Sequence, residues 1–107
     1  MEHIWTQLEK MGVIPVVAMA DAADASKLGA ALTEGGLPCV EITFRTAAAA
    51  DAIRTLSATY PNMVIGAGTV LTVAQAQTAA DAGAKFVVTP GFDNNVVDWC
   101  LENRVPI

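Results

Sequence analysis

The sequence predicts an α/β fold built from repeated strand–helix units around a parallel sheet. Apolar β-type runs alternate with alanine-rich helical stretches, and the starts of successive runs lie 20 to 25 residues apart. This spacing suits one strand, one helix and two short loops. Strands that alternate with helices pair in parallel through right-handed crossovers. The two architectures that satisfy this pattern are a doubly wound open sheet and a (βα) barrel.

The strands and helices can be placed along the chain in order. A short amphipathic helix is predicted over residues 1–11, with Ile4, Leu8 and Met11 on one side. The predicted strands cover residues 13–19, 38–44, 63–67 and 85–89, and a last one opens at Val105.

Helix signals fill each gap between these strands. The expected N-caps are Asp21 or Asp24, then Thr72 with Gln75 as a capping box, then Asp93 or Asn94, while Gly36 and Gly83 fit as helix ends. The apolar faces of the helices are predicted to carry Leu28 and Leu32, then Ile53, Leu56 and Tyr60, and finally Val97 and Leu101.

Composition narrows the class of protein. A chain of 107 residues that is 53% hydrophobic is long enough for one domain, residues 1–107, with a single core. A net charge of −5 with scattered basic residues argues against nucleic acid as a partner. The longest uncharged apolar run, residues 12–20, is too short to span a membrane, and no basic region precedes it as in a signal peptide. We therefore expect a soluble, cytoplasmic protein.

The cysteine and histidine content predicts no metal site. Cys39 and Cys100 lie in separate apolar segments, and we expect both to be buried free thiols. The single histidine, His3, has no neighbouring cluster of metal-ligating residues.

The stretch VEITFRT, residues 40–46, favours the barrel. In a strand, Val40, Ile42 and Phe44 share one face, while Glu41 and Arg45 lie on the other. Central strands of a doubly wound sheet are apolar on both faces. A barrel strand instead presents one face to helices and the other to the interior, with functional groups at its carboxyl end.

Further polar or turn-forming residues fall at the carboxyl ends of the predicted strands. Thr69 follows the two glycines of IGAGTV, which permit close approach of backbone and ligand, and Pro90 ends the strand in VVTPGF. IGAGTV lacks the third glycine of a dinucleotide fingerprint and the Gly-Lys of a P-loop. An ion pair at a strand end would also explain Glu41 and Arg45. However, a barrel would bring Arg45, Thr69 and Pro90 onto one rim.

The motifs VIPVV, GGLPCVEITFRT, VIGAGTV, DAGAKFVVTPGF and VPI, in this order, closely resemble the 2-keto-3-deoxy-6-phosphogluconate (KDPG) and 4-hydroxy-2-oxoglutarate aldolases. The resemblance covers essentially the whole chain. It implies a (βα)8 barrel, a homotrimer, and metal-free, cofactor-free class I cleavage of a phosphorylated keto-deoxy acid into pyruvate and glyceraldehyde 3-phosphate. By position, Glu41 matches the family's general acid/base, and Arg45 matches its ligand for the pyruvate carboxylate. Thr69 and Pro90 match residues that line the same pocket.

The resemblance also predicts that the Schiff-base lysine is not among these 107 residues. The family's Schiff-base lysine lies on the sixth strand, and this chain covers about half of a barrel. Lys10 and Lys27 fall in predicted helices, and Lys85 falls at the opposite end of its strand from the active rim. We expect the 107 residues alone to lack aldolase activity. Two other interpretations stay open: a non-enzymatic half-barrel that self-associates, and another lyase or isomerase of the phosphate-binding barrels.

Overall fold

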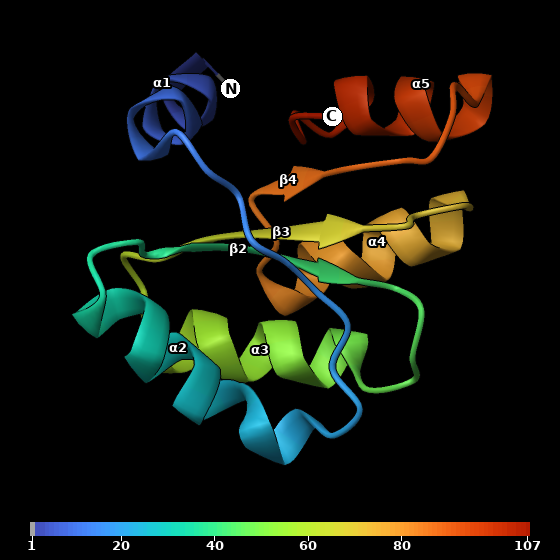
Figure 1. The fold of residues 1–107 in the computed structure, drawn as a ribbon. Helices are drawn as coiled ribbons and strands as arrows, with labels where there is room; N and C mark the ends of the chain where they lie inside the picture. The colour runs from blue at the N-terminus through green and yellow to red at the C-terminus, as the bar shows by residue number, and fades with distance from the viewer. Residues whose placement is uncertain (1) are drawn as a thin grey trace.

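The four strands of the protein pair in parallel and in the order in which they occur along the chain (Figure 1). The computed structural model describes residues 2–107. Its strands are β1 (Val16–Val17), β2 (Cys39–Thr43), β3 (Val64–Gly68) and β4 (Phe86–Val87). A doubly wound sheet reverses its strand order at a switch point. The consecutive order shows the barrel-type arrangement instead, and the fold matches about half of a (βα)8 barrel.

Five α-helices and one 3₁₀ helix are present within residues 2–107. They are α1 (Glu2–Met11), η1 (Ala22–Asp24), α2 (Ala25–Glu34), α3 (Ala49–Thr59), α4 (Val73–Ala82) and α5 (Asn94–Glu102). Figure 1 shows α2 and α3 on one side of the sheet and α1 on the other. Each predicted helix is thus confirmed, although Met1 lies outside the described residues. Among these helices, none has the length and apolar character that a membrane span needs.

The sheet continues beyond the short ranges of β1 and β4. Backbone hydrogen bonds join Lys85 N to the Ile65 carbonyl at 2.7 Å and Val88 N to the Ala67 carbonyl at 2.8 Å. The prediction for residues 85–89 is therefore close, whereas β1 is shorter than the predicted 13–19 because it lies at the sheet edge with one partner. A fifth extended segment is also present, since Val87 N donates to the Pro106 carbonyl at 2.8 Å.

Helix α5 faces the core with different residues from those predicted. Val96 and Cys100 are fully buried, whereas Leu101 is 56% exposed. The pairs 96/100 and 97/101 have the same four-residue spacing, so periodicity alone does not choose between them. The side chain of Asp93 fixes the start of the helix by accepting a hydrogen bond from Val96 N at 3.0 Å.

Strand β2 separates two apolar clusters, as its two-faced pattern predicts. Val40 and Ile42 belong to the main core between the sheet and the helices. Cys39 points to the opposite, concave face, where it packs with Val64 and Phe86. This second cluster is closed by the predicted apolar side of α1, namely Ile4, Leu8 and Met11. Helix α1 thus forms an apolar floor beneath the concave face of the sheet.

Both cysteines are buried free thiols, as expected. Burial raises the pKa of each thiol above its ordinary value.

Candidate active site

Glu41 lies in the middle of β2 on the concave face, and its carboxylate extends over the neighbouring strand. A Cβ atom placed on Gly68 of β3 would overlap the Glu41 carboxylate, and one placed on Gly66 would overlap the Phe86 ring. The two glycines were predicted to admit a ligand. In the structure the missing Cβ atoms leave room for the chain's own side chains, and Gly68 determines where the Glu41 carboxylate can lie.

The surroundings of Glu41 favour a protonated carboxyl group. Burial raises the pKa of Glu41 above the ordinary value of a glutamate, and the nearby Arg45 guanidinium partly offsets that rise. On the same face of β2, the residue two positions before Glu41 is the fully buried Cys39. A carboxyl group whose pKa is raised in this way holds its proton to higher pH than an ordinary glutamate and is suited to general acid/base chemistry.

Arg45 follows β2 in an exposed turn, two residues beyond Thr43. Its guanidinium makes neither a hydrogen bond nor an ion pair within the described part of the chain. The ion pair that would have explained Glu41 and Arg45 structurally is therefore not formed, although the two charges do interact. A solvent-accessible guanidinium can bind a planar carboxylate through two parallel hydrogen bonds.

Thr69 immediately follows β3 and adopts a backbone conformation unusual for its residue type. Its φ is 54°, in the left-handed region that a β-branched side chain disfavours. It lies between Gly68, which touches Glu41, and Val70, whose N–H donates to the Val88 carbonyl at 3.2 Å. Backbone strain of this kind gathers at functional sites, where the surrounding structure enforces it.

Pro90 lies apart from these three residues. It is exposed and lines a hollow of about 200 Å³ with Leu71 and Phe92, between the loops that follow β3 and β4. Glu41 and Arg45 do not line this hollow. The structure thus places the Glu41 carboxylate against Gly68, Arg45 and Thr69 just after β2 and β3, and Pro90 on the adjacent loop of the same rim.

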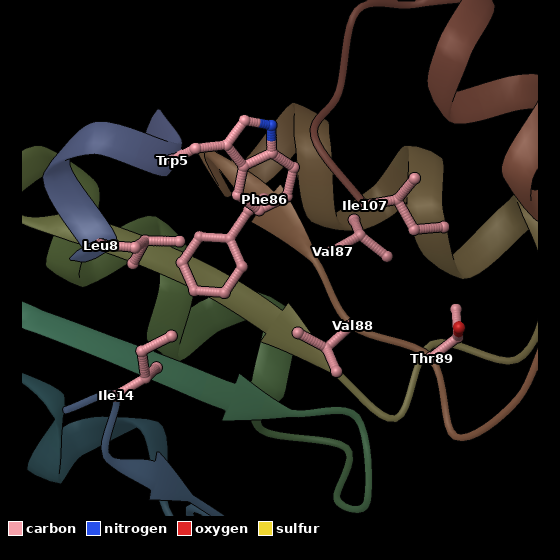
Figure 2. Close-up of a pocket in the computed structure, with 8 residues that line it drawn as sticks. All are labelled: Trp5, Leu8, Ile14, Phe86, Val87, Val88, Thr89 and Ile107. Carbon is pink, nitrogen blue, oxygen red and sulfur yellow. The ribbon is translucent and has the colours of Figure 1, made fainter. Parts of the chain in front are cut away.

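A larger cavity, of about 290 Å³, opens on the concave face between α1 and β4 (Figure 2). Figure 2 shows Leu8 of α1 directed towards the Phe86 ring, with Val88 and Thr89 further along the strand. Its walls are mainly apolar. The cavity lies beside α1, and none of its lining residues carries a charge that could bind a keto acid.

None of the three lysines faces the rim that carries Glu41. The Lys85 ammonium donates to the carbonyls of Pro61 and Met63, at 3.3 and 3.1 Å, below the amino end of β3. Lys10 and Lys27 lie exposed on α1 and α2. The predicted placement of Lys85 at the far end of its strand is confirmed.

Two features of the site had no clear signal in the sequence. The first is the contact between Gly68 and the Glu41 carboxylate, which joins two strands. The second is Thr46, whose hydroxyl donates to the Met19 carbonyl at 2.6 Å. Its position next to Arg45 was the one available hint.

The fold and the site together define a class of protein. Consecutive parallel βα units carry a half-buried carboxyl group, a free guanidinium and a strained threonine at the carboxyl end of the sheet. This is the placement of functional groups found in (βα) barrel enzymes.

Comparison with known proteins identifies the family. Residues 4–107 match the family described as KDPG and KHG aldolase, and the chain belongs to it. The 2-dehydro-3-deoxy-phosphogluconate aldolase of Treponema pallidum is 51% identical over 104 residues, which cover 97% of this chain and 50% of that protein. The chain therefore spans about half the length of the curated relatives that it matches.

Solved structures of the family have the same fold. The KDPG aldolase of Legionella pneumophila, with pyruvate captured as a covalent carbinolamine intermediate, superposes with a TM-score of 0.82 at 36% identity. That match covers 87% of this chain and 45% of the Legionella chain. The Zymomonas mobilis enzyme with 3-phosphoglycerate gives a TM-score of 0.80 at 36% identity, covering 86% of this chain and 44% of that chain. The predicted family and barrel class are thus confirmed.

Proposed function

We propose that this chain supplies the amino-terminal half of a class I aldolase barrel that cleaves 2-keto-3-deoxy-6-phosphogluconate into pyruvate and glyceraldehyde 3-phosphate. The observation that carries the proposal is the Glu41 carboxyl group, half-buried and held over Gly68, with the free Arg45 guanidinium at the end of the same strand. The Legionella relative holds pyruvate as a carbinolamine, which supports pyruvate as one product of the proposed cleavage. The Zymomonas relative holds 3-phosphoglycerate, a phosphorylated three-carbon molecule like the other proposed product.

In this proposal Arg45 binds the substrate and Glu41 transfers protons. Arg45 binds the carboxylate of the keto acid and so fixes the orientation of the neighbouring carbonyl group. Glu41, with its raised pKa, donates a proton as the carbinolamine loses water and exchanges protons again at the enamine stage. As the family resemblance implies, Thr69 beside them and Pro90 on the adjacent loop would line the substrate pocket of the complete barrel.

The amine that forms the imine would come from outside these 107 residues. Lys85 is held by two carbonyl groups at the wrong end of the sheet, and Lys10 and Lys27 lie on helices. We therefore place the Schiff-base lysine on the half of the barrel that completes this one. The reaction as proposed requires no metal or cofactor.

The proposal can be tested in a complete barrel. Residues 1–107 would be joined to the carboxy-terminal half of the Treponema pallidum relative, and this protein is called the joined barrel below. We expect it to release pyruvate from the substrate and to give a borohydride-trapped pyruvate adduct by intact mass. Glu41→Gln should lower kcat, and Arg45→Gln should raise KM.

A matched control is available for the arginine. Arg54 on α3 forms an exposed ion pair with Asp51, and Arg54→Gln should leave both kinetic constants unchanged. A folded joined barrel that shows neither cleavage nor a pyruvate adduct would contradict the proposal. So would one in which Arg45→Gln behaves like Arg54→Gln.

The same proposal includes assembly into a homotrimer, as the family resemblance implies. Phe92 and Leu71, 80% and 55% exposed, form an apolar rim around the hollow between the β3 and β4 loops. Exposed apolar groups that lie together commonly mark protein contacts. Sedimentation equilibrium of the joined barrel should give three times the monomer mass, whereas a monomer would contradict this part of the proposal.

A second candidate is a half-barrel that self-associates without catalysing a reaction. Val13 and Val16, 61% and 55% exposed, lie at or beside the uncovered edge strand β1. Uncovered parallel edges and apolar faces favour association with another chain. If the isolated 107 residues form a defined oligomer while the joined barrel lacks activity, this second function is favoured.

A further inference from the structure

The position of the Arg45 guanidinium depends on the turn that carries it. Its side chain is exposed and makes no hydrogen bond or ion pair within residues 2–107, so no side-chain contact holds it in place. A ligand-binding guanidinium that is free in this way needs a fixed backbone beneath it. The contacts of the two residues next to Arg45 therefore decide where a bound carboxylate would lie.

Both neighbours of Arg45 are tied to other parts of the barrel. On one side, Phe44 N donates to the Gly68 carbonyl of β3 at 2.7 Å. On the other side, the Thr46 hydroxyl donates to the Met19 carbonyl, beyond β1, at 2.6 Å. The turn is thus held from β3 and from the β1 side at once.

The Thr46 hydroxyl both donates and accepts a hydrogen bond. Besides donating to Met19, the hydroxyl accepts a hydrogen bond from Ala48 N at 3.3 Å, at the N-terminus of α3. If Thr46 served only to begin α3, the bond from Ala48 would suffice. The shorter bond spans 27 positions in sequence and joins the loops after β1 and β2.

Among the described residues, 2–107, no other side chain connects the loops after β1 and β2 equally well. The Thr43 hydroxyl reaches the Val17 carbonyl only at 3.4 Å, near the limit at which a hydrogen bond is effective. Thr46 therefore provides the main side-chain tie between the chain after β1 and the turn that carries Arg45.

We infer that Thr46 is a positioning residue for Arg45: its hydroxyl bond to Met19 holds the turn so that the guanidinium meets the substrate carboxylate. This inference rests on the proposed function. Since Arg45 binds the carboxylate in the ground state and the transition state alike, losing its alignment should weaken binding more than it slows the chemical step.

The test compares variants of the joined barrel by steady-state kinetics. Thr46→Val keeps the shape of the side chain but removes both hydrogen bonds, and it should raise KM about tenfold with kcat within about twofold. Thr46→Ser retains the hydroxyl and should return KM to near the parent value. The control is Thr78→Val, which removes a hydroxyl bonded to the Ala74 carbonyl on the exposed face of α4.

A double-mutant cycle separates a positioning role from a purely structural one. If Thr46 acts through Arg45, Thr46→Val should add nothing to KM in an Arg45→Gln background. Multiplied effects in the double variant would overturn the inference. It would equally be overturned if Thr46→Val lowered kcat and left KM unchanged.

The outcome also distinguishes this inference from the proposed function. If Arg45→Gln itself leaves KM unchanged, the carboxylate-binding role fails, and the positioning role fails with it. If Arg45→Gln raises KM and Thr46→Val does not, the proposed function stands and only the inference is wrong. Should Thr46→Val not fold, Thr46→Ala provides the same comparison with a smaller side chain.

Discussion

Replacing Gly68 with alanine should lower kcat strongly in a protein that still folds. The new Cβ would lie 2.7 Å from Glu41 Cδ and 2.9 Å from its Cγ, and nearer still to the carboxylate oxygen Oε1. Because Glu41 is the flexible partner, its carboxylate would move away by more than about 1 Å to regain ordinary contact. A displacement of this size at a reacting group costs about 100-fold in rate, equivalent to about 2.7 kcal/mol.

The effect of Gly68→Ala on stability should be modest. Overpacking of this kind costs about 1–3 kcal/mol, and the lower entropy of an unfolded chain with alanine offsets about 0.4–1 kcal/mol of it. The assay is pyruvate release by the joined barrel at saturating substrate, together with urea unfolding of the same protein. We expect kcat to fall about 100-fold while the free energy of unfolding falls by less than about 2.5 kcal/mol.

Gly29 offers a matched control for this prediction. A Cβ on Gly29, in α2, would meet Tyr60 Cδ2 at 2.6 Å and Leu56 Cδ2 at 2.8 Å, away from the rim. Gly29→Ala should therefore lose a similar amount of stability and keep its kcat. If Gly68→Ala keeps a kcat within about threefold of the parent, or if both variants lose activity equally, the reasoning about the Glu41 carboxylate is refuted.

Four further predictions concern the protonation of Glu41, in kinetics and in stability, the backbone strain at Thr69 and the lysines. Burial raises the pKa of Glu41 and Arg45 lowers it in part, so the limb of the kcat/KM profile that the Glu41 titration sets should lie above the ordinary glutamate range, and Arg45→Gln should move that limb to higher pH. Between the ordinary and the raised pKa the folded protein binds more protons than the unfolded chain, so stability should fall as pH rises through this window, and Glu41→Gln should remove that slope in urea unfolding. Thr69→Gly should relieve the strain of a φ of 54° and raise the free energy of unfolding by up to about 1 kcal/mol while lowering kcat; a loss of stability would argue against strain. The isolated 107 residues should give no borohydride-trapped pyruvate adduct by intact mass, and an adduct mapped to Lys85 would contradict its assignment as a structural residue.

Much of the fold was predictable because its signals are local. The spacing of the apolar runs gave the strands and helices, and the alternation along residues 40–46 separated the helix-facing Val40 and Ile42 from the concave-face Glu41. Such patterns follow from the geometry of a single strand or helix, in which side chains repeat with a fixed period. The amphipathic side of α1 was predictable for the same reason, although no local pattern indicates which surface it covers.

The boundaries and phases of the elements were less predictable. On α5, Val96 and Cys100 face the core in place of Val97 and Leu101, because two equally spaced pairs fit the same period. The Thr72 cap is formed as predicted, by a bond from Gln75 N at 3.1 Å, but the Gln75 side chain returns to Leu71 N instead of Thr72 N. These choices depend on contacts with the sheet and neighbouring loops, which a local pattern does not contain.

The sequence by itself thus determined the order of the βα units, the two faces of β2 and the residues that reach the carboxyl rim. The tertiary structure decided how those residues are positioned. It placed the Glu41 carboxylate over Gly68 and tied Thr46 to Met19, and within residues 2–107 it left the Arg45 guanidinium without a hydrogen-bond or ion-pair partner. The physical reason is that the contacts of Glu41 and Thr46 join segments that are distant in sequence, and strand pairing brings these segments together. Whether the Arg45 guanidinium finds a partner likewise depends on which side chains the folded chain places near it.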